Sequence, residues 1–465
     1  MGPILKIKTN LIKPKAIIVA EGMGGRFAGL TTLVHKGILP VAGRSNVELL
    51  VKKLKEYQVK DIYIATHHRP QDIKNEIGYG EKFGEDISIH YNYEPKLNNT
   101  ASAANNIIFG KYKADFQDDK YIWIFACDVG FPGADLGAFK QSFLEAVARG
   151  GKGRDGKPKI VGGVGFVIRP YEDFYRRRPT AVINSENLIT KWQFNPITNY
   201  SEGEAIRKQI DNKNVEEFEK TTKLHGLPFP TFFYILSKDA FEALAKINDR
   251  EQSDIDFIVH LFKLFPNRLW AHFFKEEGLI LGGLSRQYYD FNTPVDYYRA
   301  QWQFIKTASK MMTDTHTYFS SINSFLGLDL IGVKIDQKNV INCVVNDYVQ
   351  LMEDCSLKNS IIGQRCIIRN AVINNSIILP NTFINYHPSK DDEAVEITNS
   401  IVGGGGQFPT FFDNIHSKTI RIDGTFAVPD NRMQIMLSDL GISEADVKMC
   451  EQAFEVSQNS NKMKE

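Results

Sequence analysis

A glycine-rich loop and the two cations that follow it are the residues of this sequence best suited to binding a phosphate. The group comprises Gly22, Gly24 and Gly25, then Arg26 and Lys36. Glycine loops let backbone N–H groups approach a phosphate closely, and cations neutralise its charge. The glycines would also suit a tight turn between a strand and a helix without any ligand, so by themselves they leave that alternative open.

Two common phosphate-binding motifs do not fit this loop. After Gly22 and Gly24, the third glycine of a GxGxxG motif would fall at position 27, which is Phe27, and the sequence contains no GxxxxGK[ST]. A plain Rossmann dehydrogenase and a P-loop enzyme are therefore disfavoured. A second basic group is formed by Arg176–Arg178. Runs of this kind most often lie on a solvated surface, and contact with a phosphate is the alternative.

The glycine loop follows a short apolar run, and the surrounding sequence alternates between strand and helix patterns. AIIVA at residues 16–20 has no polar alternation, which indicates a strand buried on both faces of a parallel sheet. The alternation predicts a mixed, mainly parallel, doubly wound (Rossmann-like) α/β sheet whose ligands bind beyond the carboxyl ends of the strands. Helices are expected at 46–57, 100–110 and 294–312, and further strands at 61–68, 87–93, 121–130, 160–168, 232–236 and 269–274.

Beyond residue 335 the pattern changes to a repeated short phrase. INCVV (341–345), KNSII (358–362), NNSII (374–378) and TNSIV (398–402) share it, and the first three are spaced by 17 and then 16 residues. Three hexapeptides supply roughly 18 residues for one coil of a parallel β-helix, in which each coil buries its apolar edge on the next. The sequence therefore predicts a β-helix, with a β-sandwich as the alternative.

The composition is that of an ordinary globular protein. With 43% hydrophobic and 24% charged residues, a chain of 465 residues can bury a core in each of about two domains. Fifty-six Lys and Arg against fifty-five Asp and Glu give a net charge of +1, which offers no bulk attraction for nucleic acid or a membrane surface. We expect an α/β domain over 1–312, a β-helix over 313–430 and a helical tail over 431–465.

Cysteine usage and the absence of long apolar runs predict the compartment. The five cysteines are scattered without a CxxC pair, which is not typical of a disulfide framework or a zinc site. The basic start MGPILKIKTNLIKPK lacks the apolar core of a signal peptide, and nothing approaches the roughly 18 apolar residues of a membrane span. We therefore expect a cytoplasmic protein.

The glycine loop belongs to a longer stretch that resembles a known family signature. AIIVAEGMGGRFAGLTTLVHKGILPVAG at 16–43 is similar to the AAGxGTRLxPLTxxxPKxLLPVxG pattern of the sugar-1-phosphate nucleotidyltransferases, also called nucleotide-sugar pyrophosphorylases. The resemblance continues through GYGEKFGEDISIHYNYEPKLNNTASA, CDVGFPGADL and YYDFNTPVDYYRA, covering about residues 16–300. It implies the branch of the family with a C-terminal left-handed β-helix. Such β-helices commonly associate, so a homo-oligomer is expected.

The resemblance also implies a reaction and its residues. An NTP and a sugar-1-phosphate-like acceptor would give a nucleotide sugar and pyrophosphate, which requires positioning and charge neutralisation rather than a covalent intermediate. Arg26 and Lys36 would hold the triphosphate, and Asp128 and Asp290 would bind Mg²⁺. The loop glycines, together with Thr100 and Ala101, would surround the nucleotide.

The sequence departs from the family pattern mainly on the acceptor side. The EKP motif, whose lysine contacts the sugar phosphate in the family, aligns with Phe194-Asn195-Pro196, and the NAG stretch of the sugar pocket aligns with Pro230-Thr231-Phe232. In the loop, Glu21, Gly25 and His35 replace Ala, Thr and Pro. A regulatory paralogue that binds nucleotide or nucleotide sugar and a partner subunit, with little or no activity, is therefore the alternative to an active transferase.

Overall fold

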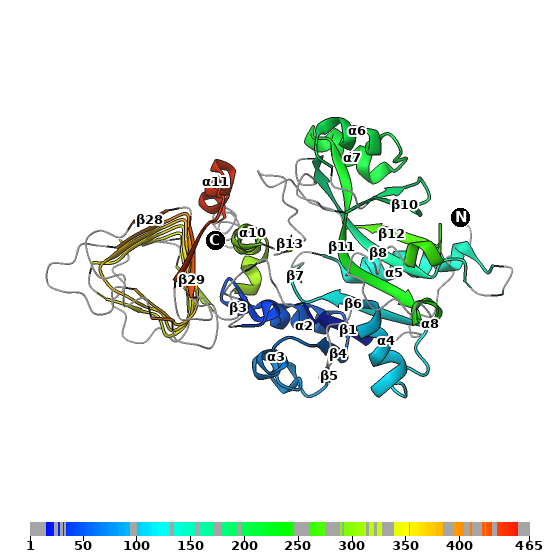
Figure 1. The fold of residues 1–465 in the computed structure, drawn as a ribbon, viewed down its shortest axis with the longest axis horizontal. Coiled ribbons are helices and arrows are strands. Elements are labelled where there is room, and N and C mark those ends of the chain that lie inside the picture. Colours follow the sequence, from blue (N-terminus) through cyan, green and yellow to red (C-terminus); the bar gives the residue numbers. More distant parts are fainter. Residues whose placement is uncertain are drawn as a thin grey trace, which may run out of the picture.

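The computed structural model describes residues 15–22, 27, 31, 34–93, 100–130, 134–153, 156, 158–171, 179–193, 197–245, 261–274, 289–290, 293–312, 316–319, 323–327, 339–352, 354–384, 395–403, 410–411, 421–423, 425–429 and 435–453. Over these residues the chain forms a sheet-containing N-terminal part and a prism of short strands, with helix α10 (Pro294–Met312) between them (Figure 1). The helix spans the residues predicted from the sequence. Among the helices of the described residues, none is both long and apolar enough to cross a membrane.

The N-terminal part is built on a seven-stranded sheet of order β12-β8-β11-β6-β1-β4-β5. Strand β1 pairs in parallel with both β4 and β6. Strand β5 pairs in parallel with β4, and β12 pairs in parallel with β8. Strand β11 runs antiparallel to β6 and β8. The predicted mixed, mainly parallel α/β sheet is confirmed. Its strands are β1 (Lys15–Ala20), β4 (Asp61–Thr66), β5 (Ser88–Tyr93), β6 (Tyr121–Ala126), β8 (Gly162–Pro170), β11 (Gly226–Ser237) and β12 (Leu269–Phe273).

Local sequence explains the central strands and the helices around them. Ala16, Ile17 and Ile18 of β1 are each 0% exposed, as expected for a strand covered on both faces. The helices are α2 (Asn46–Glu56), α3 (Pro70–Ile77), α4 (Thr100–Asn105), α5 (Leu136–Gly150), α6 (Tyr200–Arg207), α7 (Lys213–Thr222) and α8 (Lys238–Ala245). Short elements between them are η3 (Lys36–Ile38), η4 (Glu81–Phe83), η5 (Asn106–Lys111), β2 (Pro40–Val41), β3 (Arg44–Ser45), β7 (Val129–Gly130), β9 (Thr180–Ile183), β10 (Ile189–Gln193) and β13 (Tyr289–Asp290).

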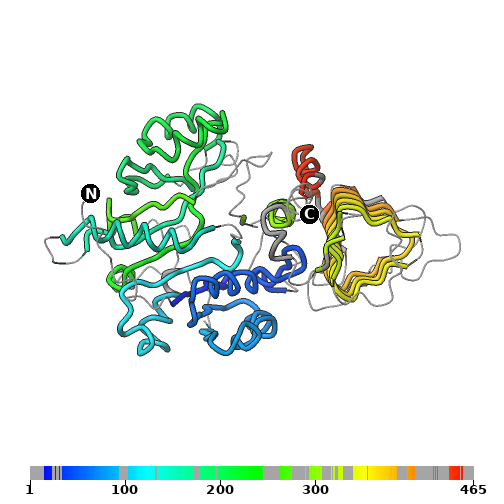
Figure 2. Tube along the Cα trace, turned by 180° about the vertical axis from the view of Figure 1, so that it is seen from behind, coloured from blue at the N-terminus to red at the C-terminus, as the bar shows by residue number. Residues whose placement is uncertain are grey.

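The C-terminal part is a parallel β-helix with three faces, and Figure 2 shows its triangular cross-section. Its faces are the sheets β14-β15-β17-β20-β23-β26-β29-β30, β16-β19-β22-β25-β28 and β18-β21-β24-β27. The strands are β14 (His316–Phe319), β15 (Ser324–Gly327), β16 (Val340–Ile341), β17 (Val344–Val345), β18 (Gln350–Leu351), β19 (Ser356–Lys358), β20 (Ile361–Ile362), β21 (Ile367–Ile368), β22 (Ala371–Asn374), β23 (Ile377–Ile378), β24 (Thr382–Ile384), β25 (Val395–Thr398), β26 (Ile401–Val402), β27 (Thr410–Phe411), β28 (Arg421–Asp423), β29 (Thr425–Pro429) and β30 (Ile435–Asp439).

The repeated phrase has a structural reason at each of its positions. Its asparagine occupies a left-handed turn, with φ between 47° and 55° in five coils, a conformation that asparagine tolerates well. The serine after it is buried in four coils, where its Oγ accepts a backbone N–H from the next coil. The asparagine side chains bond one another in a ladder at 2.9–3.2 Å, through Asn323, Asn342, Asn359, Asn375, Asn399 and Asp423.

Two features of this region differ from the sequence prediction. Asn323 and Ser324 begin one more coil of the same kind. This coil does not match the repeated phrase in the sequence, because Phe325 stands where the phrase has its first aliphatic residue after the serine. The tail expected to be helical from residue 431 begins with strand β30, which pairs antiparallel with β29, before α11 (Glu444–Gln452). The open edge of a sheet favours an added strand over a helix that local periodicity alone would allow. The predicted domain limits stay predictions.

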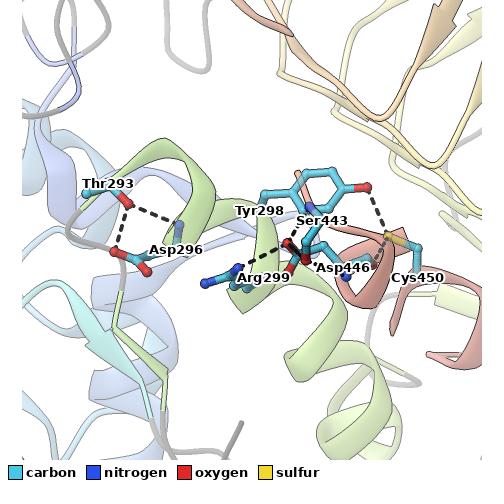
Figure 3. A network of polar contacts seen from close by, with 7 residues as sticks. All are labelled: Thr293, Asp296, Tyr298, Arg299, Ser443, Asp446 and Cys450. Atoms are coloured by element: carbon cyan, nitrogen blue, oxygen red, sulfur yellow. Dashed lines mark hydrogen bonds and ion pairs between the residues drawn. The ribbon is translucent and has the colours of Figure 1, made fainter. Parts of the chain in front are cut away.

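Helix α10 links the two parts of the fold through a polar network (Figure 3). Arg299 of α10 forms a two-point ion pair with Asp446 of α11, at 2.6 Å and 3.0 Å. Tyr298 donates to the backbone oxygen of Asn375 in the β-helix at 2.5 Å and lies 2.9 Å from Cys450 Sγ. The helix therefore contacts both the β-helix and the C-terminal helix.

Candidate active site at the carboxyl ends of β1 and β6

The strand order reverses between β1 and β6, and we refer to the region beyond the carboxyl ends of these two strands as the crevice. The chain passes from β1 to β4 and β5 on one side, then returns to β6 on the other side of β1. Strand order reverses here, and in open α/β sheets ligands bind at such a point, beyond the carboxyl ends of the strands. The glycine loop follows β1 and Asp128 follows β6, with Val19 and Ala126 in register. The topology thus places the carboxyl end of β1 beside the turn that carries Asp128.

Lys36 and Asp128 meet in this crevice. The Nζ atom of Lys36 lies 2.5 Å from Oδ2 of Asp128, and 5.6 Å from the ring centre of Phe27. The Lys36 side chain is only 9% exposed, whereas that of Asp128 is 24% exposed. A buried cation needs an anionic partner, so Lys36 and Asp128 stabilise each other. A bound phosphate could replace Asp128 as the partner of Lys36, and a metal ion could replace Lys36 as the partner of Asp128. Sequence reasoning missed Phe27, for which no chemical signal was visible.

His35 holds Lys36 in place at the start of η3. Its Nδ1 accepts the Gly37 N–H at 2.9 Å, and its Nε2 lies 3.0 Å from the oxygen of Ala20. Because Nδ1 accepts, the proton must be on Nε2, and the ring is neutral. Burial lowers the pKa of His35 to about 4, which agrees with this tautomer. The histidine that replaces the family proline therefore ties the lysine segment to the end of β1.

The neutral state of His35 predicts a pH dependence of stability. The unfolded chain takes up a proton near pH 6.5, but the folded chain does so only near pH 4. Between these values the unfolded state binds more protons, so the free energy of unfolding falls as the pH is lowered, by at most about 1.4 kcal/mol per pH unit for this group. We expect His35→Gln to flatten the profile measured by urea denaturation from pH 7 to pH 4. Burial also lowers the pKa of His272 to about 4, so that residue contributes a pH dependence of its own. A slope in the His35→Gln variant equal to that of the wild type would show that His35 does not contribute.

Asp290 lies beside Asp128 along the backbone. Strand β13 pairs antiparallel with β7, so that Asp290 is opposite Val129 and Tyr289 is opposite Gly130. A Cβ on Gly130 would lie 2.0 Å from Tyr289 Cζ, so only glycine lets the tyrosine ring cross β7 at this position. Two segments that are far apart in sequence, each carrying an aspartate, therefore run side by side. The family resemblance implies that the two acids share a site, which stays a prediction, whereas no sequence signal indicated the role of Tyr289.

The remaining predicted residues fall in three groups. Gly22 is exposed just after β1, and no atom of the described residues would lie within 4 Å of a Cβ placed there. Thr100 and Ala101 begin α4, a neighbour of β1. The others lie outside the described residues: Gly24, Gly25, Arg26, the Arg176–Arg178 run and the Phe194-Asn195-Pro196 stretch. Glu21, the departure that places a carboxylate beside the loop, is 2% exposed.

Phe232 has a strained backbone next to this crevice. Its φ is 57°, in the left-handed region that bulky side chains avoid, and it sits where the β11–β8 register shifts between Pro230 and Tyr234. The next residue, Phe233, pairs with Phe125 near the carboxyl end of β6. Strain of this kind costs about 1–3 kcal/mol and is concentrated at functional sites. The phenylalanine aligned with the sugar-pocket glycine therefore keeps a backbone conformation that glycine adopts freely.

The strain at Phe232 can be measured with a pair of substitutions. Phe232→Gly and Phe232→Ala remove the same ring, but alanine keeps the left-handed strain and glycine relieves it. We expect the glycine variant to be more stable by about 1 kcal/mol in urea denaturation. Equal stabilities, or a more stable alanine variant, would show that the native backbone is not strained at this residue.

Comparisons with known proteins find similarity in the N-terminal part of the chain. Residues 15–152 match the family model described as Nucleotidyl transferase. A UTP–glucose-1-phosphate uridylyltransferase from Synechocystis is 26% identical over 83 residues, 18% of this chain and 21% of that protein. A choline-phosphate cytidylyltransferase from Haemophilus influenzae is 33% identical over 82 residues, 16% of this chain and 35% of that protein.

Among solved structures, one described as a glucose-1-phosphate thymidylyltransferase from Bacillus anthracis in complex with sucrose is 20% identical. The aligned region covers 62% of this chain and 93% of the chain in that structure, with a TM-score of 0.44. The family match and the two relatives confirm the resemblance to the sugar-1-phosphate nucleotidyltransferases, and the family match extends over residues 15–152. The chain matches only about a fifth to a third of the length of those relatives.

Proposed function

Residues 15–152 carry a domain of the nucleotidyl transferase family, and from this premise we propose that the chain transfers a nucleoside monophosphate from an NTP to a phosphorylated, sugar-1-phosphate-like acceptor. The observation that carries the proposal is the Lys36–Asp128 pair at the strand-order reversal, with Asp290 on the adjoining strand. A cation and an acid at this point suit a ligand made of phosphate and a divalent metal.

The chemistry requires positioning and charge neutralisation. A phosphate oxygen of the acceptor attacks the α-phosphorus of the NTP, the bond from that phosphorus to the bridging oxygen breaks, and pyrophosphate leaves with that oxygen. Lys36 would leave Asp128 and donate to a phosphate oxygen, and Arg26 would neutralise a second one. Among the described residues no atom crowds Gly22, so its backbone could receive a phosphate.

Two carboxylates fit a Mg²⁺ ion that is shared with the substrate. Mg²⁺ usually takes one or two carboxylates together with substrate phosphates and waters, and it supplies charge stabilisation to the transferring group. Asp128 and Asp290 would be those carboxylates, from segments that the β7–β13 pairing holds together. Within the described residues no group of three or more His, Cys, Asp or Glu side chains could hold a metal.

The acceptor is proposed at the level of its phosphate. The names of the two relatives contain glucose-1-phosphate and choline-phosphate, which are both phosphate monoesters. Phe232 places an aromatic residue where the family sugar pocket has a glycine, so we propose an acceptor other than an unmodified hexose-1-phosphate. Nucleotide sugar would be the product if the acceptor is a sugar phosphate. Self-association through the β-helix stays a prediction.

Release of pyrophosphate tests the proposal directly. The full chain is incubated with Mg²⁺, each of the four common NTPs in turn and a panel of sugar phosphates and other phosphate monoesters, and pyrophosphate is measured with a coupled assay. We expect release with one base and one acceptor class, and none after chelation with EDTA. Silence across the whole panel, with nucleotide binding retained, would favour the regulatory paralogue instead.

A further inference from the structure

We propose that Asn46 is a positioning residue that sets the relation between the turn carrying Asp128 and the strand carrying Asp290. This inference rests on the proposed function, in which the two aspartates act on one metal ion. Asn46 is the first residue of α2 and is 1% exposed. It belongs to no motif recognised in the sequence.

The amide of Asn46 holds the backbone on both sides of Asp128. Its Nδ2 donates to the oxygen of Cys127 at 2.7 Å and to the oxygen of Val129 at 2.9 Å. An amide nitrogen has two hydrogens, so both are used, and the carbonyl partners can only accept. The orientation of the side chain is therefore fixed, and the carbonyl groups of the residues before and after Asp128 are fixed with it.

The oxygen of the same amide reaches the segment of Asp290. The Tyr289 hydroxyl donates to Asn46 Oδ1 at 2.9 Å. Tyr289 directly precedes Asp290, and its ring crosses the strand at Gly130. One buried side chain thus joins both acid-bearing segments.

Helix α2 also ties this junction to the lysine segment. The Asn46 N–H donates to the oxygen of Leu39 at 3.3 Å, three residues after Lys36. The Ser45 hydroxyl accepts the N–H of Glu48 at 3.3 Å and caps the helix, which keeps its first residue in place. Removing the amide would leave three buried polar groups without this partner and would release the turn of Asp128.

Metal affinity measures this role without depending on turnover. Mn²⁺ binding to the full chain is followed by electron paramagnetic resonance, with and without inorganic pyrophosphate. Pyrophosphate is used in place of an NTP because it carries no nucleobase, so the preferred nucleotide need not be known. We expect Asn46→Ala to weaken Mn²⁺ binding about 10-fold or more, the usual effect of losing a group that orients metal ligands. Tyr289→Phe removes one of the three bonds and should give a smaller loss.

Asn212 provides the matched control. It is also 1% exposed, and its amide donates to Asn184 O at 3.0 Å and to Asn187 Oδ1 at 2.8 Å, away from the crevice. Asn212→Ala should lower the melting temperature as Asn46→Ala does, but should leave Mn²⁺ affinity unchanged. A folded Asn46→Ala chain that binds Mn²⁺ as tightly as the wild type would overturn the inference, and so would a wild-type chain that binds no Mn²⁺.

The two proposals fail in different ways. If wild-type protein binds Mn²⁺ and loses it in Asn46→Ala, but releases no pyrophosphate with any NTP and acceptor, the proposed reaction is wrong and the positioning role of Asn46 stands. If pyrophosphate is released and Mn²⁺ affinity is indifferent to Asn46, the reaction stands and the inference is wrong.

Discussion

Asp128→Asn is expected to lower the rate of pyrophosphate release by about 10³-fold while the protein stays folded. The substitution removes the charge that a metal ion needs from this ligand. The amide oxygen can still accept from Lys36 Nζ, now 2.5 Å from the carboxylate, so the lysine keeps a partner. The loss should appear in kcat at saturating NTP, with a melting temperature close to that of the wild type.

Asp119→Asn is the matched control for this change. Asp119 also pairs with a lysine, Lys15, at 2.7 Å, but at the opposite end of β1 and β6. Removing that charge should leave turnover within about twofold of the wild type, since a pair far from the carboxyl ends of the strands does not meet the substrate. Full activity in the Asp128 variant would contradict the metal assignment, and equal losses in both variants would point to a general effect of charge.

Asp446→Ala is expected to lower the free energy of unfolding by about 3 kcal/mol, because it strands a buried cation. The side chain of Asp446 is 5% exposed and that of Arg299 is 16% exposed. Asp446 also accepts from the backbone and the hydroxyl of Ser443, at 2.9 Å and 2.7 Å, and so caps α11 (Figure 3). Urea denaturation of the full chain measures the loss.

An exposed ion pair supplies the comparison. Lys208 and Glu204 lie 3.6 Å apart with side chains 74% and 45% exposed, so Glu204→Ala should cost no more than about 0.5 kcal/mol. Similar losses for Glu204→Ala and Asp446→Ala would mean that the α10–α11 contact has no special weight.

The Asp446 contribution should also depend on pH. Burial would raise the pKa of Asp446, but the hydrogen bonds and charge of Arg299, with Ser443, hold it below its ordinary value. A carboxyl with a depressed pKa stabilises the fold fully above its unfolded pKa of about 3.9, and the stability is lost as the pH falls through the folded value. The difference between wild type and Asp446→Ala should therefore be constant from pH 7 to about pH 5 and shrink below pH 4.

Helix α10, which carries Arg299, also contacts the segment that follows Lys36. Its Tyr297 hydroxyl donates to the oxygen of Pro40 at 2.5 Å, and Gln301 both donates to Pro40 and accepts from the Ala42 N–H. A Cβ on Gly43, the next residue, would lie 1.6 Å from Asn346 Oδ1 of the β-helix. The turn that ends the lysine-bearing segment is therefore packed against both α10 and the β-helix.

Local sequence predicted most strands of the N-terminal sheet and the coils of the β-helix. Apolar runs without alternation, such as AIIVA at 16–20, predict strands covered on both faces, and the carboxyl ends of parallel strands meet at one edge of a sheet. That Lys36 and Asp128 share one site was implied by the family resemblance of the surrounding sequence rather than by the strand pattern. The repeated asparagine and serine likewise predicted stacked coils, because each coil repeats the same local conformation.

Only the tertiary structure decided the contacts that fix the site. Asn46 and Cys127 are 81 residues apart in the chain, and their hydrogen bond depends on how α2 and β6 pack, which no local periodicity encodes. The left-handed backbone of Phe232 arises from a register shift between two strands, and β30 forms because β29 leaves an open edge. Local sequence fixes the conformations that a segment can adopt, whereas pairing partners distant in the chain select among them.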